Sequence, residues 1–282
     1  MRIDLHTHST VSDGTGTPAQ VMREAAEAGL HIVALTDHDS VDGWEEAAAT
    51  AADAGLGFVP GIEVSCRHHG ISIHLLSYWH RPDDDQVATM LSLTREARVQ
   101  RAREIVDKVA VDYPVTWEAV ADLAGDAATV GRPHIADALV AQGVVPTRDE
   151  AFTDILGGNS RYYVPHYAPE VTDAVRTMSA AGGVTVFAHP GADARGRIVT
   201  TSVIESMARA GLVGLEIDHR DHDERQRDRL ARIAARLGLV RTGASDYHGT
   251  GKRNELGENL TDPKAFIALE KARAAGRPSA VN

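Results

Sequence analysis

The 282-residue sequence has little cysteine, few aromatic residues and no long apolar run. Its one cysteine, Cys66, can form neither an internal disulfide nor a thiolate zinc cluster, which favours the cytoplasm as the working compartment. No apolar stretch approaches the roughly 20 residues of a membrane-spanning helix, and the N-terminal residues lack the apolar core of a signal peptide. The sequence therefore predicts a soluble, cytoplasmic protein with no membrane partner.

Positive charge is also scarce. The chain has 29 Lys and Arg residues against 40 Asp and Glu residues, which gives a formal net charge of −11. Proteins that track duplex DNA neutralise its phosphates with a broad basic surface, and such a surface is not expected here. A phosphate-bearing ligand would have to be bound locally, as a small nucleotide or a short oligonucleotide. The sequence does not indicate an oligomeric state.

What the chain does contain is histidine, 14 residues in all. His6 and His8 stand two apart in an extended run, so both imidazoles should leave the same face of the strand. The same spacing returns near the far end as Asp246 and His248. Between the two pairs, further candidate ligands each follow an apolar, strand-like segment: His38, Glu63, His74 and His189. The simplest interpretation is one site that is assembled from the whole chain.

With Asp13, these groups make nine candidate metal ligands. Imidazole and carboxylate together suit borderline divalent ions such as Mn²⁺, Fe²⁺ or Zn²⁺. At three or four protein ligands for each ion, with one carboxylate bridging, nine groups are enough for two or three ions. Manganese is the expected ion, with iron or zinc as alternatives.

Apolar runs alternate with amphipathic stretches in two separate parts of the chain. Strands are expected at residues 3–5, 32–35, 57–59, 63–66, 71–76, 184–188, 213–217 and 240–244, and helices at residues 18–28, 41–54, 171–181, 201–210, 223–237 and 263–275. Residues 86–164 are mostly helical, without clear strand signals. This pattern predicts an α/β barrel in two parts, residues 1–85 and 165–282, interrupted by a small helical insertion domain at residues 86–164.

The motifs that carry the candidate ligands resemble those of the polymerase and histidinol phosphatase (PHP) family of metal-dependent phosphoesterases. The order and spacing match at residues 4–9, 12–15, 35–39, 61–65, 188–191 and 245–249. The resemblance implies a distorted (β/α)7 TIM-like barrel in which all nine residues bind metal. It implies one ion on His6, His8 and Asp246, a second on His74 and His189, and a third on Asp13, His38 and His248, with Glu63 bridging.

Within the family, residues 131–136 resemble the branch that removes phosphate from nucleoside 3′,5′-bisphosphates and trims short RNA from its 5′ end. Arg132 offers a fork of donors that matches phosphate geometry, and His134 offers a second donor. The resemblance implies that both bind a substrate phosphate and that the insertion caps the barrel mouth. His222 also resembles a position near the substrate.

The expected chemistry is hydrolysis by water whose pKa the ions lower, with Asp13, His38, Glu63 and His248 at the reacting centre. Three carboxylates would leave three divalent ions with excess positive charge, which attracts a phosphate dianion. His134, His219 or His222 is expected to protonate the leaving oxygen. His166 and His219 are candidates for lining the barrel mouth. Asp4 and Asp37 are expected to hold the imidazole N–H groups of ligands.

Two other functions remain open. A phosphomonoesterase of the same fold that acts on a non-nucleotide ester, such as histidinol phosphate or a sugar phosphate, would need the same metals. A non-catalytic phosphate-binding protein would be expected to lack some ligands. The sequence also leaves open whether a nucleotide meets an arginine-rich segment (Arg95, Arg98, Arg101, Arg103 and Lys108) or aromatic rings that could stack a base (Trp79, Tyr162, Tyr163 and Tyr167).

Overall fold

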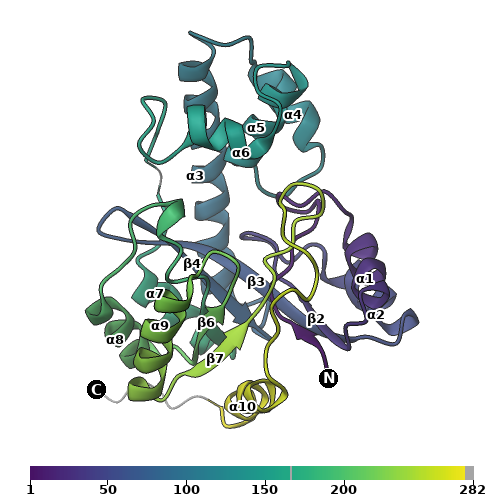
Figure 1. The fold of residues 1–282 in the computed structure, drawn as a ribbon, viewed down its shortest axis with the longest axis vertical. Coiled ribbons are helices and arrows are strands. Elements are labelled where there is room, and N and C mark those ends of the chain that lie inside the picture. Colours follow the sequence, from purple (N-terminus) through teal and green to yellow (C-terminus); the bar gives the residue numbers. More distant parts are fainter. Residues whose placement is uncertain (166, 277–282) are drawn as a thin grey trace.

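Seven strands form one sheet that curls into a nearly closed barrel in the computed structural model, which describes residues 1–165 and 167–276 (Figure 1). The strands neighbour one another in chain order: β1 (Ile3–Asp4), β2 (Ile32–Leu35), β3 (Gly57–His68), β4 (Ile71–Tyr78), β5 (Val184–Phe187), β6 (Gly214–Asp218) and β7 (Val240–Gly243). A parallel bridge between Thr7 and Tyr247, just beyond β1 and β7, draws the two edges together. The prediction of a distorted TIM-like α/β barrel is confirmed.

The barrel departs from simple β/α alternation at β3 and β4. These strands pair antiparallel through a turn at His69 and Gly70, and β4 also pairs antiparallel with β5. The sequence predicted two short strands where β3 is a single strand of 12 residues. Pro60 lies where β3 changes partner: Pro60 pairs with Leu35 of β2, and Gly61 pairs with Tyr78 of β4. At the end of a ladder, the missing N–H of proline costs little.

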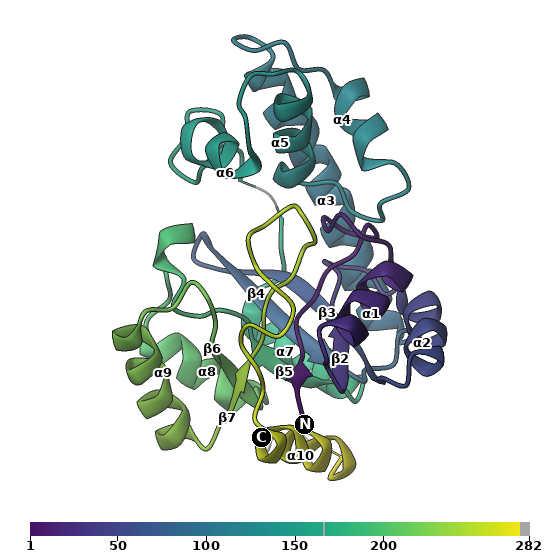
Figure 2. The same cartoon turned by 45° about the vertical axis from the view of Figure 1, so that its right-hand side comes forward.

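Helices cover the outside of the barrel (Figure 2). They are α1 (Pro18–Glu27), α2 (Trp44–Asp53), α7 (Val171–Ala180), α8 (Thr201–Ala210) and α9 (Glu224–Leu237), with α10 (Pro263–Ala274) across the end opposite the insertion. A short 3-10 turn, η2 (Asp193–Arg195), follows β5. The predicted start of α1 is confirmed, because the helix begins at Pro18 and Thr17 and Gln20 form a capping box at this end.

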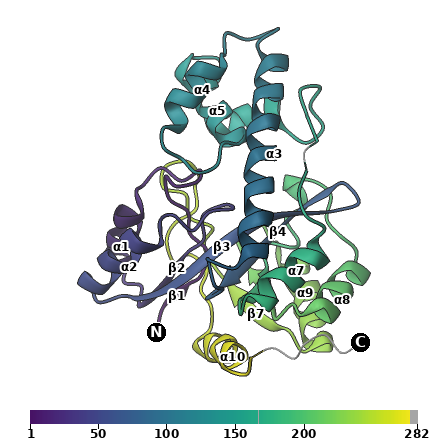
Figure 3. The ribbon, with the colours of Figure 1, turned by 180° about the vertical axis from the view of Figure 1, so that it is seen from behind.

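The predicted helical segment consists of α3 (Asp85–Val109), α4 (Trp117–Ala124), α5 (Arg132–Ala141), α6 (Arg148–Ala151) and the π-helix η1 (Phe152–Leu156). Figure 3 shows α3 beginning alongside the barrel near α7 and extending beyond it, with α4 and α5 beside its upper half. These helices have an apolar core of their own, which includes Ile105, Val109, Ile135 and Leu139. Among the described residues, no helix has both the length and the apolar character needed to cross a membrane.

The insertion rests on the loop that carries Asp13. The backbone N–H of Ala128 donates to the carbonyl of Val11 at 2.9 Å. Arg148, which forms a bidentate ion pair with Asp137 of α5, donates from Nη1 to the carbonyl of Asp13 at 3.0 Å. The helical segment is therefore fixed directly above one of the predicted ligands.

Candidate metal centre

Glu63 lies at the middle of a buried cluster of histidines. Its carboxylate is almost fully buried, with 1% of the side chain exposed. Oε2 lies 3.2 Å from His6 Nε2, 3.1 Å from His8 Nε2 and 3.2 Å from His38 Nδ1, and Oε1 lies 2.8 Å from His74 Nδ1 and 3.1 Å from His189 Nε2. One carboxylate thus faces five imidazoles, a geometry that suits a bridging ligand.

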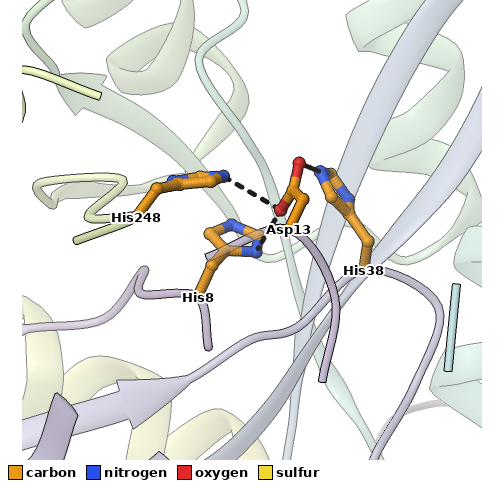
Figure 4. Close-up of side chains that lie close together, drawn as sticks. All are labelled: His8, Asp13, His38 and His248. Carbon is orange, nitrogen blue, oxygen red and sulfur yellow. Dashed lines mark ion pairs between the residues drawn. The ribbon is translucent and has the colours of Figure 1, made fainter. Parts of the chain in front are cut away.

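Two further carboxylates flank this hub. Asp246 Oδ1 lies 3.4 Å from His6 Nε2 and 3.5 Å from His8 Nε2. On the other side, Asp13 Oδ1 lies 3.7 Å from His8 Nδ1 and 3.2 Å from His248 Nε2, and its Oδ2 lies 3.8 Å from His38 Nε2 (Figure 4). All nine predicted ligands therefore meet in one place.

The described residues contain three groups whose potential ligand atoms lie within 4.8 Å of one another. The groups are His6, His8, Glu63 and Asp246; His8, Asp13, His38 and His248; and His38, Glu63 and His74. The first and second resemble two of the predicted ligand sets, with His8 common to both. The third group contains His38 and His74 but not His189. His189 Nε2 lies 3.1 Å from Glu63 Oε1, the oxygen that His74 also contacts.

Most ligands lie where parallel strands end, as expected for a barrel of this type. His38 follows β2, His189 follows β5, and Asp246 follows β7. Glu63 and His74 do not obey that rule, since they lie within β3 and β4. His74 pairs with Ser65, two residues from Glu63, so both side chains leave the same face of the antiparallel pair.

The donor set fits divalent cations. His6 Nε2 and His8 Nε2 are only 3.0 Å apart, and two ring nitrogens at that distance can share one proton at most. His38 Nδ1 and His248 Nε2 are buried without a hydrogen-bond partner among the described residues. Lone pairs that converge in this way are the arrangement a bound ion requires.

The charge states of these ligand side chains in the folded protein are also consistent with a site for divalent cations. Burial opposes ionisation of Glu63, but His38 and His6 outweigh it and hold the pKa of Glu63 well below its usual range. Burial lowers the pKa of His189 to about 3 and that of His248 to about 4, so both imidazoles are neutral. His8 differs, because Asp246 and Glu63 outweigh burial and raise its pKa to about 9. A metal ion bound there would displace that proton.

Comparison with known proteins identifies the family, since the PHP domain model matches residues 4–173. The chain belongs to the PHP domain family. It is 34% identical over 251 residues to the 3′,5′-nucleoside bisphosphate phosphatase of Chromobacterium violaceum, covering 89% of this chain and 88% of that protein. It is 31% identical over 261 residues to the 5′-3′ exoribonuclease of Haemophilus influenzae, covering 92% and 94%.

A solved structure from Bifidobacterium adolescentis, provisionally named a metal-dependent phosphoesterase, superposes on this PHP chain with a TM-score of 0.93. The two are 40% identical, and the match covers 98% of each chain. The predictions of the family and of a phosphoester hydrolase that depends on metal are confirmed. The family and the donor set together indicate divalent metal ions.

Glu216, which was not predicted as a site residue, contacts two of the candidate ligands, His6 and His189. Its Oε1 lies 3.0 Å from His6 Nδ1, and its Oε2 accepts the backbone N–H of His189 at 2.8 Å. These contacts direct His6 Nε2 toward Glu63. A signal was present, because Glu216 is a carboxylate between two apolar residues, Leu215 and Ile217, of a predicted strand.

Among the described residues, no imidazole N–H donates to Asp4 or Asp37, so the prediction that they hold the rings of ligands was wrong. Asp37 accepts the N–H and hydroxyl of Ser9 at 2.8 and 2.7 Å and the hydroxyl of Ser12 at 2.6 Å. Asp4 accepts backbone N–H groups, including that of Ser245 at 3.0 Å. Both aspartates therefore position the loops that carry ligands, rather than the ligands themselves.

Two cations also contact the centre. Arg195 Nη2 lies 2.7 Å and Lys252 Nζ 3.0 Å from Asp246 Oδ2. The other oxygen of Asp246 faces His6 and His8. Arg195 ends the short 3-10 turn η2 and Lys252 lies in a loop, so neither position has a periodic pattern from which its contact with Asp246 could be predicted.

The predicted substrate contacts have different environments. His134 is buried, and its Nδ1 accepts the N–H of Gly131 at 3.1 Å, which leaves Nε2 available. Arg132 donates from Nη1 to the carbonyl of Leu156 at 2.9 Å and lies over the Phe152 ring. It belongs to the insertion and contacts none of the nine ligands among the described residues.

His222, which was predicted to contact the substrate, has both ring nitrogens engaged by backbone groups. Its Nδ1 donates to the carbonyl of Ile217 at 2.8 Å, and its Nε2 accepts the N–H of Gly191 at 2.9 Å, so both nitrogens are occupied by backbone. His219 is better placed. Its Nδ1 accepts the N–H of Asp221, and its Nε2 lies 3.6 Å from Asp246 Oδ2.

The remaining predictions about the barrel mouth concern one histidine and the aromatic residues. His166 lies outside the described residues. Trp79 packs against Phe266 and Arg273 near α10, at the end of the barrel opposite the insertion, so it cannot stack a base at the mouth. Tyr162 is buried, whereas Tyr163 and Tyr167 are exposed.

Proposed function

We propose that this PHP protein hydrolyses a phosphomonoester of a nucleotide, namely the 3′-phosphate of a nucleoside 3′,5′-bisphosphate, and that it trims short 5′-phosphorylated RNA. The observation that carries the proposal is the single buried centre around Glu63, in a chain whose relatives include a bisphosphate phosphatase and an exoribonuclease. The ligand is a mononucleotide or short oligonucleotide rather than duplex DNA. The cytoplasm is the proposed location.

The proposed cofactor is two or three divalent ions, manganese first, with iron or zinc as alternatives. His6, His8 and Asp246 would hold one ion, His74 and His189 a second, and Asp13, His38 and His248 a third. Glu63 would bridge, which is supported by the contacts of both its oxygens. Bound there, divalent ions supply positive charge for the phosphate oxygens and lower the pKa of water.

The chain itself positions the substrate and moves the proton. Asp13, His38 and His248 lie close together with His8 (Figure 4), and Glu63 lies beside His38. The scissile phosphate is proposed to lie against Asp13, His38, Glu63 and His248. His134 Nε2 is free to donate to a phosphate oxygen, because Gly131 fixes the other nitrogen. Of the three candidate proton donors, His134 and His219 keep a nitrogen for this purpose, whereas His222 does not.

The insertion is proposed to act as a cap domain, with residues 86–164 as its limits. Support comes from its separate apolar core and from the contacts of Arg148 and Ala128 with the Asp13 loop. A cap fixed above the centre would exclude water and select the leaving group.

The test is a panel of phosphate esters with manganese-loaded protein: a nucleoside 3′,5′-bisphosphate, a 5′-mononucleotide, histidinol phosphate and a short 5′-phosphorylated RNA. Released phosphate and the nucleotide products are measured. Preference for the bisphosphate or the RNA supports the proposal. Preference for histidinol phosphate would leave the metal centre intact but replace the substrate with a non-nucleotide ester, and no release from any ester would overturn the proposal.

A further inference from the structure

Arg148 of α6 joins three segments that lie far apart in the chain. Its guanidinium forms a bidentate ion pair with Asp137 of α5, from Nε to Oδ1 and from Nη2 to Oδ2. Nη1 donates to the backbone carbonyl of Asp13 at 3.0 Å. The same nitrogen lies against Gly251, since a Cβ on Gly251 would overlap it. One largely buried guanidinium, with 14% of the side chain exposed, is therefore shared by the insertion and by two loops of the barrel.

These two loops carry candidate ligands, Asp13 on one and His248 on the other. The carbonyl of His248 accepts the N–H of Thr15 at 3.1 Å and that of Gly251 at 3.3 Å. The N–H of Thr250 donates to Thr15 Oγ1 at 2.8 Å. The loops are thus fastened to each other, and Asp13 Oδ1 comes within 3.2 Å of His248 Nε2. A shift of either loop would change the geometry of both ligands.

The insertion fixes the direction in which Arg148 points. A guanidinium is planar, so two parallel hydrogen bonds to the Asp137 carboxylate leave Nη1 aimed at a fixed point. Asp137 lies three residues beyond His134 on α5, and side chains at that spacing share a face of the helix. His134, Asp137 and Arg148 line the same cleft as Gly14 of the Asp13 loop. The ion pair therefore also holds the helix that presents His134, the proposed phosphate contact, beside the Asp13 loop.

A second ion pair joins the same two elements at the surface. Arg253 Nε, in the loop that follows His248, lies 3.4 Å from Asp149 Oδ2 of α6. The two side chains are 82% and 59% exposed, and an ion pair in such a position contributes little to stability. The buried contact of Arg148 is therefore the link that can transmit the position of the insertion to the ligands.

We propose that Arg148 is a positioning residue, through which the insertion holds Asp13 and His248 in the geometry that binds an ion. This inference rests on the proposed function, because it concerns the ion assigned there to the group that contains both ligands. The coupling is reciprocal, so an ion at this group also fixes the insertion over the centre. The ion proposed for His74 and His189 does not depend on Arg148, since neither histidine lies on these loops.

The test uses Arg148→Gln, with Arg253→Gln as the matched control. Calorimetry follows the titration of manganese into metal-stripped protein, so the readout does not depend on turnover. Arg148→Gln should bind one ion fewer at parental affinity, with that ion weakened about 10- to 100-fold, as expected when a contact that orients ligands is lost. The control should match the parent. Arg148→Lys, which keeps the charge but not the planar fork, should recover part of the loss.

Asp137→Asn is a second variant, should Arg148→Gln fail to fold, because it removes the anion that directs Arg148 and leaves the guanidinium in place. The same ion should be weakened, and the double variant should lose no more than the larger single effect. Amide hydrogen exchange gives the reciprocal readout. Manganese should slow exchange in α5 of the parent, and it should do so less in Arg148→Gln.

Parental manganese affinity in both Arg148→Gln and Asp137→Asn would overturn the inference. An equal weakening of every ion, as expected if Arg148 only stabilised the fold, would also overturn it, as would the same loss in Arg253→Gln. If the parent binds manganese but cleaves no ester, the proposed function fails, while the titrations still decide the role of Arg148.

Discussion

At the scale of single residues, the centre depends on one carboxylate. Glu63 contacts five imidazoles, so its replacement by an isosteric amide removes a negative charge and turns one acceptor into a donor. We expect Glu63→Gln to lose bound manganese and to lower kcat/KM for a phosphate ester by at least about 100-fold. Metal content by mass spectrometry and phosphate release measure this.

A matched control is available for that variant. Glu170 also lies 2.7 Å from a histidine, His68, but this pair is partly exposed on the outside of the barrel. Glu170→Gln should keep the metal content and activity of the parent. Equal losses in the two variants would mean that Glu63 has no special role.

Glu216 should act through the ligands it positions. Removal of its charge in Glu216→Gln weakens the support of His6 and of the His189 backbone, and we expect manganese affinity to fall about 10- to 100-fold. Turnover at saturating manganese should remain close to that of the parent. Competition with a fluorescent chelator measures the affinity, and an unchanged value would contradict the positioning role.

At the scale of elements, the loop that carries Asp13 has no room for a side chain at Gly14. A Cβ there would lie 2.5 Å from the carbonyl oxygen of His8 and 2.9 Å from the backbone nitrogen of Ser9. Gly14→Ala must shift the loop, which should cost about 1–3 kcal/mol of stability and reduce manganese binding. Denaturant unfolding and metal content measure the two effects.

Gly16, in the same loop, is the control, because a Cβ on Gly16 would come no closer than 3.5 Å to any neighbouring atom. Gly16→Ala should stay within about 0.5 kcal/mol of the parent and keep its metal. If both substitutions were equally harmless, the loop would not be fixed by the close approach of Gly14 to His8.

Several elements could be predicted from local signals. The predicted helix at residues 18–28 agrees with α1, because proline at the first helical position is a local start signal, and β2 has the predicted bounds of residues 32–35. The predicted helix at residues 41–54 begins only at Trp44, with Gly43 as its N-cap residue. The pairing of β3 with β4 could not be predicted, because the choice of an antiparallel partner is a tertiary property.

The residues that form the site could be predicted more completely than the contacts that surround them. The spacing of His6 and His8 and the strand ends before His38, His189 and Asp246 are local properties of the chain, whereas Glu63 and His74 lie within long strands whose extent was not predicted. The fully engaged ring of His222, the support from Glu216 and the location of Trp79 depend on contacts between distant segments. No pattern within one segment reports them.

At the scale of the whole molecule, a buried histidine links stability to pH. His80 is 3% exposed, and neither ring nitrogen has a partner among the described residues. Burial lowers its pKa from 6.5 to about 4. Between these values the unfolded chain binds a proton that the folded chain does not. This contribution to stability is therefore complete above the unfolded pKa and is lost as pH falls, by about 3 kcal/mol at most.

Accordingly, His80→Leu should weaken the fall in stability between about pH 6.5 and about pH 4. Denaturant unfolding of parent and variant in chelator measures the difference without a contribution from bound metal. The same pH dependence in both proteins would show that His80 does not titrate on unfolding.

The strands and loops of the barrel bring the nine ligands to one centre, and hydrolysis at this centre is expected to depend on bound metal. The most direct measurement is turnover of adenosine 3′,5′-bisphosphate while manganese is titrated into metal-stripped protein. We expect no phosphate release in chelator, a rise that saturates at two or three ions per chain, and adenosine 5′-monophosphate as the product. Full turnover of the stripped protein in chelator would contradict this dependence on metal.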